Sequence, residues 1–372
     1  MRTRQQTSGF TKSKVYSRFH EDPYVLVGES LPFLTQLDRC DDSNPGPGNF
    51  SVMHDKCGVA TYTYQQGAES VRIVDGPLAQ PVGGLSHIPW NECDPEWGDP
   101  STDYLATLAA ARTNPSRPTV NVPSFIGELK DLPGAIRDQG EKSFKWARSD
   151  SVGVQFGILP MVSDVMKLMN FHDGVARRSD ELDRLQSGNG LKRRVRLKST
   201  GKVTTSLGKP GDASAIAVTS TRHSVYATLR WKSAGNFQFP PSGSRERSNY
   251  VKRLLLGVTR ENDVYASALV AWNLLPWSWM ADWFGNVGTY LEANMNQSIA
   301  SPAEIWVCRS SATVHKVRAY GTSCAHSLVT KSRESGSVSL EASLPIIGPK
   351  KMSILGGIGL QKARGNFPRA LR

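Results

Sequence analysis

The side chains best suited to chemistry in this sequence are cations, and they gather in one stretch of the chain. Residues 188–260 hold fifteen Lys and Arg and two acids, a net charge of +13, whereas the remaining residues hold 30 basic and 31 acidic side chains. A block of that charge repels itself unless an anion offsets it. Clustered Lys and Arg neutralise phosphates, so the stretch predicts an anionic partner, with nucleic acid first and an anionic surface second. A solvated basic sheet face is the other interpretation.

Thirteen cations of this stretch are predicted RNA contacts. Aromatic residues such as Tyr226 and Trp231 are interleaved with them and could hold unpaired bases. The peptide Arg194-Val-Arg-Leu-Lys198 alternates basic and apolar residues, which in a strand places the cations on one face and the apolar side chains on the other. The predicted contacts are Lys192, Arg193, Arg194, Arg196, Lys198, Lys202, Arg222, Arg230, Lys232, Arg245, Arg247, Lys252 and Arg253.

Catalytic and metal-binding patterns have little support. The sequence contains no H-E-x-x-H, no G-x-S-x-G and no G-x-G-x-x-G after a strand. His54 and Cys57 have the spacing of half a zinc site, but their nearest possible partners, His87 and Cys93, are not paired at ligand spacing. We therefore expect no enzyme, no catalytic residue, no metal and no cofactor.

The elements that must position these residues alternate between strands and helices. The 372 residues allow two domains or one composite body. Apolar residues recur at helical spacing in 104–111 and 264–294, and short-period patterns predict strands, including Glu304–Tyr320 and Val338–Leu344. We predict an α+β fold with six regions: β-rich 1–100, helical 101–187, basic and β-rich 188–260, Trp-rich and helical 261–297 packing on 101–187, β-strands 298–348, and a basic C-terminal helix or tail 349–372.

Cysteine usage and hydropathy bear on the compartment. The five cysteines are odd in number and form no C-x-x-C pair, which favours a reducing site of synthesis. No apolar segment follows the basic first residues, so no signal peptide is expected. Residues 264–281 carry no charge and meet the lower length limit for a membrane span, but Asn273 and Pro276 interrupt them. We expect a buried helix there and no stable membrane insertion.

Three blocks carry a family resemblance. They are Pro123-Ser-Phe-Ile-Gly-Glu-Leu-Lys-Asp-Leu-Pro133, Gln155-Phe-Gly-Ile-Leu-Pro-Met-Val-Ser-Asp164 and Leu275-Pro-Trp-Ser-Trp-Met-Ala-Asp-Trp-Phe-Gly285. The second and third resemble signature segments of the maturation (A) proteins of single-stranded RNA bacteriophages, which show Q-F-G-x-x-P-x-x-S-D and later P-x-S-x-x-x-D-W-x-x-x-x-G. The residues that match are Phe156, Pro160, Ser163, Asp164, Pro276, Ser278, Asp282, Trp283 and Gly288.

The resemblance implies a fold and a set of linked tasks. The implied fold is an elongated body with an α-helical bundle region and an antiparallel β-sheet region built from non-contiguous segments. The motif residues would be scaffold, with Trp283 in a buried helix and Asp282 as a buried polar anchor between two helical segments. The implied protein is made in the bacterial cytoplasm and enters the virion as one copy. It would replace a coat-protein dimer, bind genomic RNA near its 3′ end and attach the particle to a host pilus for RNA entry.

The receptor binding that the resemblance implies is expected in the strand-rich first hundred residues, because recognition usually lies on loops carried by a sheet. Trp90 and Trp97 stand in a turn-rich, acidic stretch and are unusual there unless they are packed or touch a partner. They are the predicted receptor contacts, although later strands could equally reach the receptor. Two other classes stay open: a cellular RNA-binding protein, suggested by the charge, and a membrane-active or lysis protein, suggested by residues 264–281.

Overall fold

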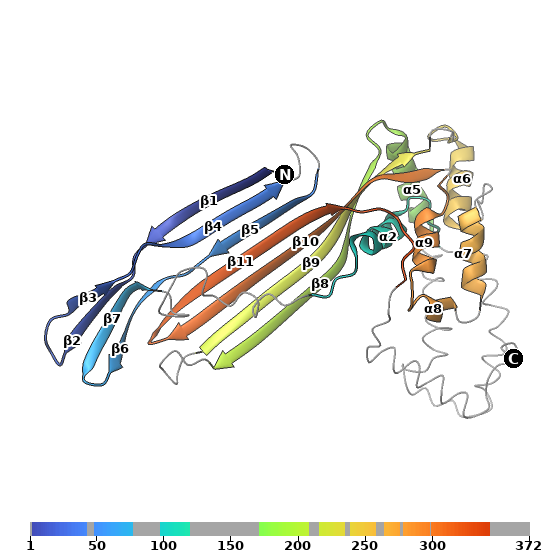
Figure 1. Cartoon of the computed structure of the whole chain (residues 1–372). Helices are drawn as coiled ribbons and strands as arrows, with labels where there is room; N and C mark the ends of the chain where they lie inside the picture. The colour runs from blue at the N-terminus through green and yellow to red at the C-terminus, as the bar shows by residue number, and fades with distance from the viewer. Residues whose placement is uncertain are drawn as a thin grey trace, which may run out of the picture. The chain divides into compact units, whose positions relative to one another are not determined.

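The computed structural model describes residues 2–42, 48–76, 97–119, 171–207, 216–234, 239–257, 264–275, 278–297 and 299–342 (Figure 1). The chain divides into two compact units. Unit 1 comprises Met1–Thr102, Arg196–Ala227 and Trp306–Gly336, and unit 2 comprises Asp103–Val195, Thr228–Ile305 and Ser337–Arg372. Both units are therefore built from segments far apart in the sequence.

A seven-stranded antiparallel sheet combines strands from early and late parts of the described chain. Its order is β1-β4-β5-β11-β10-β9-β8. Strand β5 pairs with β11 from Ser327↔Lys56 to Arg333↔Phe50, so N-terminal and C-terminal segments become neighbours. The strands are β1 (Arg2–Thr11), β4 (Phe33–Asp42), β5 (Phe50–Lys56), β8 (Leu191–Leu207), β9 (Ile216–Ser233), β10 (Ala300–Ala319) and β11 (Thr322–Ser335).

Strand β9 shows how the sequence produces this sheet. From Thr221 to Trp231 every second side chain is buried, while the residues between them are partly or fully exposed. Successive side chains of a strand point to opposite faces, so the apolar members of this alternation collect on one side. Strands β10 and β11 are joined by a two-residue turn, Tyr320 and Gly321. Both residues have a positive φ, the geometry that tight hairpins favour.

A second, four-stranded antiparallel sheet has the order β3-β2-β7-β6. Its core consists of Tyr62, Val71 and Ile73, which pack against Val317 and Cys324 of the β10–β11 hairpin within unit 1. This apolar cluster holds the small sheet to the end of the long hairpin. The strands are β2 (Lys14–Phe19), β3 (Val25–Glu29), β6 (Ala60–Gln66) and β7 (Glu69–Gly76).

The helix Thr102–Thr113 contacts a buried tryptophan and is followed by a polar junction. Trp231 is fully buried, and its Nε1 donates to Oγ1 of Thr113 at 3.2 Å. Asn114 follows this helix, and its Nδ2 donates to the carbonyls of Glu292 at 3.1 Å and Met295 at 3.0 Å. The helices are α2 (Thr102–Thr113), α5 (Phe171–Gln186), α6 (Arg245–Leu255), α7 (Val264–Leu274), α8 (Ser278–Ala281) and α9 (Val287–Asn294).

The prediction of a mixed fold with antiparallel sheets is confirmed, but the predicted strand Val338–Leu344 is wrong in its described residues. Strand β11 lies within the region 298–348 that was expected to form β-strands, but described residues 338–342 form no strand beyond one bridge between Gly285 and Ala342. The segment 188–260, expected to be basic and β-rich, contains β8 and β9 and also helix α6.

The expected continuous helix 264–294 is also divided, into α7, α8 and α9. Its second break is explained by Asn286, whose side chain accepts from the Glu341 backbone N–H at 2.8 Å and donates to the Ser339 carbonyl at 3.0 Å. Among the helices of the described ranges, none combines the length and apolar character needed to cross a membrane.

Candidate nucleic-acid interface

The thirteen predicted RNA contacts fall on three elements: β8, β9 and α6. Exposed members are Lys192, Arg194, Arg196, Lys202, Arg222, Lys232, Arg245, Lys252 and Arg253. Strand β8 is the last strand of its sheet order, and all its residues from Ser199 to Thr205 are exposed. On the preceding part of β8, Val195 and Leu197 are partly buried while Arg194 and Arg196 are exposed, in agreement with the expected alternation.

Ion pairs seen among the described residues hold Arg193, Arg230, Arg247 and Lys198 within the protein. Arg193 lies 2.7 Å from Glu181 of α5, and Arg230 lies 3.7 Å from Glu304 of β10. Arg247 is the clear correction among them. Its guanidinium is completely buried, lies 2.7 Å from Asp183 and packs over the ring of Phe239 at 4.9 Å. A buried arginine with these partners stabilises α6 and cannot reach RNA.

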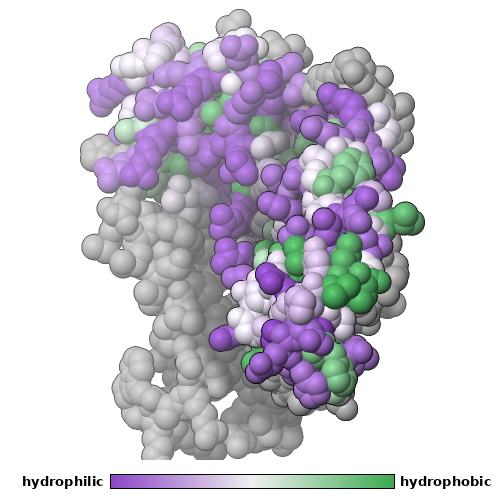
Figure 2. Space-filling view, turned by 90° about the vertical axis from the view of Figure 1, so that its left-hand side faces the viewer, coloured by the Kyte–Doolittle hydropathy of each residue, from purple (hydrophilic) through white to green (hydrophobic). Residues whose placement is uncertain are grey.

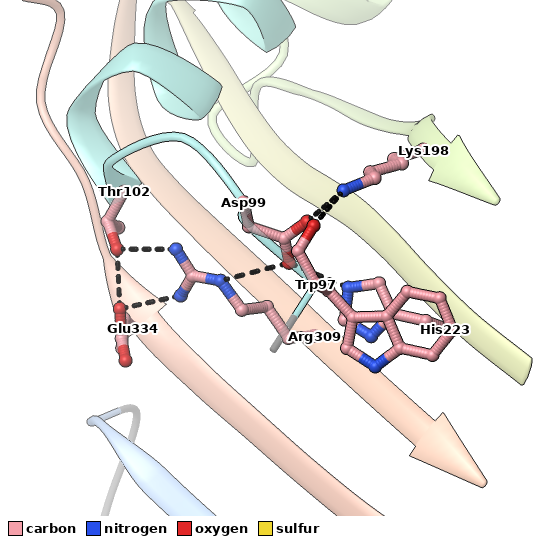
Figure 3. Close-up of polar contacts among 7 residues, drawn as sticks. All are labelled: Trp97, Asp99, Thr102, Lys198, His223, Arg309 and Glu334. Carbon is pink, nitrogen blue, oxygen red and sulfur yellow. Dashed lines mark hydrogen bonds and ion pairs between the residues drawn. The ribbon is translucent and has the colours of Figure 1, made fainter. Parts of the chain in front are cut away.

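Lys198 is the fourth paired cation, and its partner belongs to a compact polar cluster (Figure 3). Asp99 accepts hydrogen bonds from Nζ of Lys198 at 2.7 Å and from Nε2 of His223 at 2.6 Å. Arg309 of β10 lies 3.8 Å from the same carboxylate and also donates to Glu334 at 2.8 Å. Burial favours a higher pKa for Asp99, but the hydrogen bonds and charges of Lys198 and His223 outweigh it and lower the pKa.

The cluster fastens the segment before α2 to the strands of unit 1. Thr102 donates to Glu334 and accepts from Arg309 at 3.0 Å, so the segment 97–102 contacts β8, β9, β10 and β11. Trp97, a predicted receptor contact, stacks on the His223 ring with centroids 4.8 Å apart and planes 10° apart. This packing accounts for Trp97 without a receptor. Trp90 lies outside the described residues.

The resemblance residues that the structure describes lie around one carboxylate. Oδ1 of Asp282 accepts from the backbone N–H of Gly288 at 2.9 Å, and Oδ2 accepts from Nε1 of Trp272 at 3.4 Å. Asp282 thereby links α7 to the first turn of α9. Ser278 begins α8 and accepts from the Asp282 backbone at 3.1 Å. Trp283 is half-buried, which corrects the expectation of full burial. Phe156, Pro160, Ser163, Asp164 and Pro276 lie outside the described residues.

Histidine and cysteine side chains in the described ranges form local polar pairs. His54 of β5 forms a hydrogen bond with Asp38 of the neighbouring strand β4. His326 is buried, accepts from the backbone N–H of Gly58 at 3.1 Å and lies 3.5 Å from Sγ of Cys324. Within the described part of the chain, no three His, Cys, Asp or Glu side chains are arranged to hold a metal ion.

The sequence prediction missed cations outside 188–260. Lys56, Lys316, Arg318 and Lys331 are exposed and belong to strands β5, β10 and β11 of the same sheet. A count along the chain does not reveal them, because their segments are nearly neutral in charge. Only the alternation within each strand and the pairing of the strands would have found them.

Comparison with protein-family models finds no match, and no curated protein is significantly similar to this chain. The resemblance therefore depends on the quoted blocks alone.

Proposed function

We propose that this protein is the single-copy maturation protein of a single-stranded RNA bacteriophage. In this role it binds the genomic RNA in its 3′ region, replaces a coat-protein dimer in the capsid and attaches the virion to a host pilus for RNA entry. Two of the three sequence blocks supply the family resemblance. The single observation that carries RNA binding is the cationic edge strand β8, with Lys192, Arg194, Arg196 and Lys202 all exposed.

A basic edge strand supports RNA binding for a physical reason. Alternate residues of β8 project to the same side, so Lys192, Arg194 and Arg196 form a row that can follow a phosphate backbone. Charged side chains also protect an edge strand from pairing with other chains, which is the competing explanation. Salt dependence separates the two, because only phosphate contacts release counterions on binding.

The test replaces Lys192, Arg194, Arg196 and Lys202 together with glutamine. Each phosphate contact contributes about 0.7 log units of binding constant per log unit of salt for single strands, so the slope should flatten by up to about three units. Binding of a short, mixed-sequence single-stranded RNA is measured across a salt series. The matched control replaces four exposed cations outside the basic stretch, Lys12, Lys14, Arg39 and Arg72, and should keep the slope.

An unchanged slope in the folded β8 variant would contradict RNA binding by this strand. A cellular RNA-binding protein would show the same salt dependence but would not co-purify with phage particles. Recovery of one copy per intact virion therefore distinguishes the proposed function from that alternative, and absence from purified virions would refute it.

Host attachment is favoured by an apolar surface on the four-stranded sheet. Val25, Val27 and Leu31 expose 61%, 63% and 87% of their surface, and Phe19 exposes 51%. Figure 2 looks onto the side where Figure 1 shows β2, β3, β6 and β7, and hydrophobic patches stand out there among mostly hydrophilic residues. Exposed apolar patches of this kind mark protein-binding sites.

A variant with Val25→Thr and Val27→Thr keeps β-branched side chains in the strand but removes apolar surface. Reduced adsorption to host cells with unchanged RNA binding is the expected result. Normal adsorption would place the attachment surface elsewhere.

A further inference from the structure

One face of the seven-stranded sheet collects cations from four strands. In β11, Lys331 pairs with Ser310 of β10 and Val52 of β5, while Ser327 pairs with Val314 and Lys56. Directly paired residues project to the same face, and so do residues two apart in one strand. Lys56 and Lys331 therefore share a face with Lys316 and Arg318, which lie two and four positions beyond Val314 on β10.

Strand β9 adds a fifth cation to this face. Oγ1 of Thr219 contacts Nδ1 of His315 at 2.8 Å, and the hydroxyls of Thr221 and Thr313 lie 3.4 Å apart. These contacts join the odd-numbered residues of β9 and β10 on the opposite face of the sheet. Arg222 consequently projects with the even-numbered residues of β10. We call the face with Lys56, Arg222, Lys316, Arg318 and Lys331 the outer basic face.

Positive charge predominates on the outer basic face. The register also places Asp38 and Asp42 on it; Asp42 forms an ion pair with Arg4, and Asp38 is hydrogen-bonded to His54. All five cations are exposed, and no ion pair found among the described residues includes any of them. On the opposite face, by contrast, Arg309 is neutralised by Glu334 and Asp99.

The surface between these cations is formed by small side chains, two of them serines. Residues at the centre of the face are small, and they are partly buried by their neighbours: Ser310, Ala312, Val314, Ser327 and Val329. Small side chains leave room for a backbone to approach the sheet, and serine hydroxyls donate to phosphate oxygens. The core of a protein–protein interface is instead enriched in aromatic residues and depleted of lysine.

We infer that the outer basic face binds the phosphate backbone of RNA, as a second contact surface besides β8. This inference rests on the proposed RNA-binding function. Four of the five cations come from outside residues 188–260, so the site exists only once β5, β10 and β11 are paired with β9. Backbone contacts position RNA without reading its sequence, so this face contributes affinity and not base specificity.

The test replaces Arg222, Lys316, Arg318 and Lys331 with glutamine in the full-length chain. Binding of the same mixed-sequence single-stranded RNA should weaken, and its salt slope should flatten by up to about three units. The charge-matched control again removes Lys12, Lys14, Arg39 and Arg72. A flattened slope in the β8 variant but not in the folded outer-face variant would refute this inference and leave the proposed function standing. Failure of the wild-type protein to bind RNA would refute both.

Lysine protection tests the same face without any substitution. The native protein is acetylated with and without the RNA, and modification of each lysine is quantified by mass spectrometry. Lys56, Lys316 and Lys331 should become several-fold less reactive when RNA is bound, while Lys12 and Lys14 should not change. Equal reactivity of the first three lysines in both states would overturn the assignment. Protection by purified coat protein, with none by RNA, would also overturn it and would identify the face as a protein interface.

Discussion

Adding one methyl group at Gly288 should destabilise the protein. A β-carbon built at this position would lie 2.6 Å from Oδ2 of Asp282 and 3.3 Å from Nε1 of Trp272. Both distances are shorter than ordinary van der Waals contact, so the carboxylate or the indole must move. Because Asp282 also accepts the Gly288 backbone N–H at 2.9 Å, moving it weakens the link between α7 and α9.

The expected magnitude combines two opposing effects. Inserting a methylene or methyl group into a well-packed site costs about 1–3 kcal/mol. Replacing glycine by alanine in a helix gains roughly 0.5–1 kcal/mol, because the unfolded chain loses freedom. Gly288→Ala should therefore lower the free energy of unfolding by about 0.5–2 kcal/mol.

A matched control is available in α5. A β-carbon at Gly174 would meet only Cδ1 of Leu255, at 3.9 Å, which is ordinary contact. Gly174→Ala should leave the free energy of unfolding unchanged or raise it by up to about 1 kcal/mol. Of the two alanine variants, only Gly288→Ala is therefore expected to lower the free energy of unfolding.

The assay is urea unfolding of a double-mutant cycle with Asp282→Ala. Removing the carboxylate should itself cost about 1–3 kcal/mol, since it accepts from Gly288 and Trp272. In that background the methyl group at 288 no longer meets Oδ2, so Gly288→Ala should lose most of its destabilising effect. Equal effects of Gly288→Ala in both backgrounds would refute the reasoning, because they would show that Asp282 does not press on residue 288.

Two further predictions concern buried polar groups. Burial, with a smaller effect of His315, lowers the pKa of His326 to about 4. As the pH falls toward about 4, the imidazole is therefore protonated in the unfolded chain before it is protonated in the folded protein. The free energy of unfolding should therefore fall by about 3 kcal/mol as the pH drops from about 6.5 to about 4. Urea unfolding at several pH values should show a weaker pH dependence for His326→Gln, but not for the control His20→Gln at an exposed site. Asp99→Asn removes the charge that faces Lys198 and His223, so it should lower the free energy of unfolding by about 1–3 kcal/mol and speed proteolysis near residue 99. A variant as resistant to protease as the wild type would contradict a structural role for Asp99.

Local periodicity was sufficient to predict several elements. The region 188–260 was expected to be β-rich, and in its strand β9 the alternating residues Val225, Ala227, Leu229 and Trp231 are all buried. The helix expected after Thr102 is α2. Both predictions succeed because the repeat at which side chains return to the same face is set by the local backbone conformation. It needs no information from distant residues.

Strand β11 shows where such reasoning stops. Its sequence is rich in Ser, Thr, Lys and Arg, and His326 occupies a completely buried position that no apolar pattern marks. The turn before it is also unusual, because Tyr320 adopts a positive φ where Asn or Asp is the familiar signal. Pairing with β10 and β5 makes this segment a strand, and those partners are decided by the tertiary structure.

The sequence by itself determined the sign of the charge, its concentration in residues 188–260 and the alternation of strands and helices. The tertiary structure alone decided which cations face solvent. Arg247 is neutralised inside the protein by Asp183, and Lys198 by Asp99, whereas Lys316 and Lys331 are exposed on a shared face. The physical reason is that net charge adds along a chain, but burial and ion pairing depend on which distant segments become neighbours.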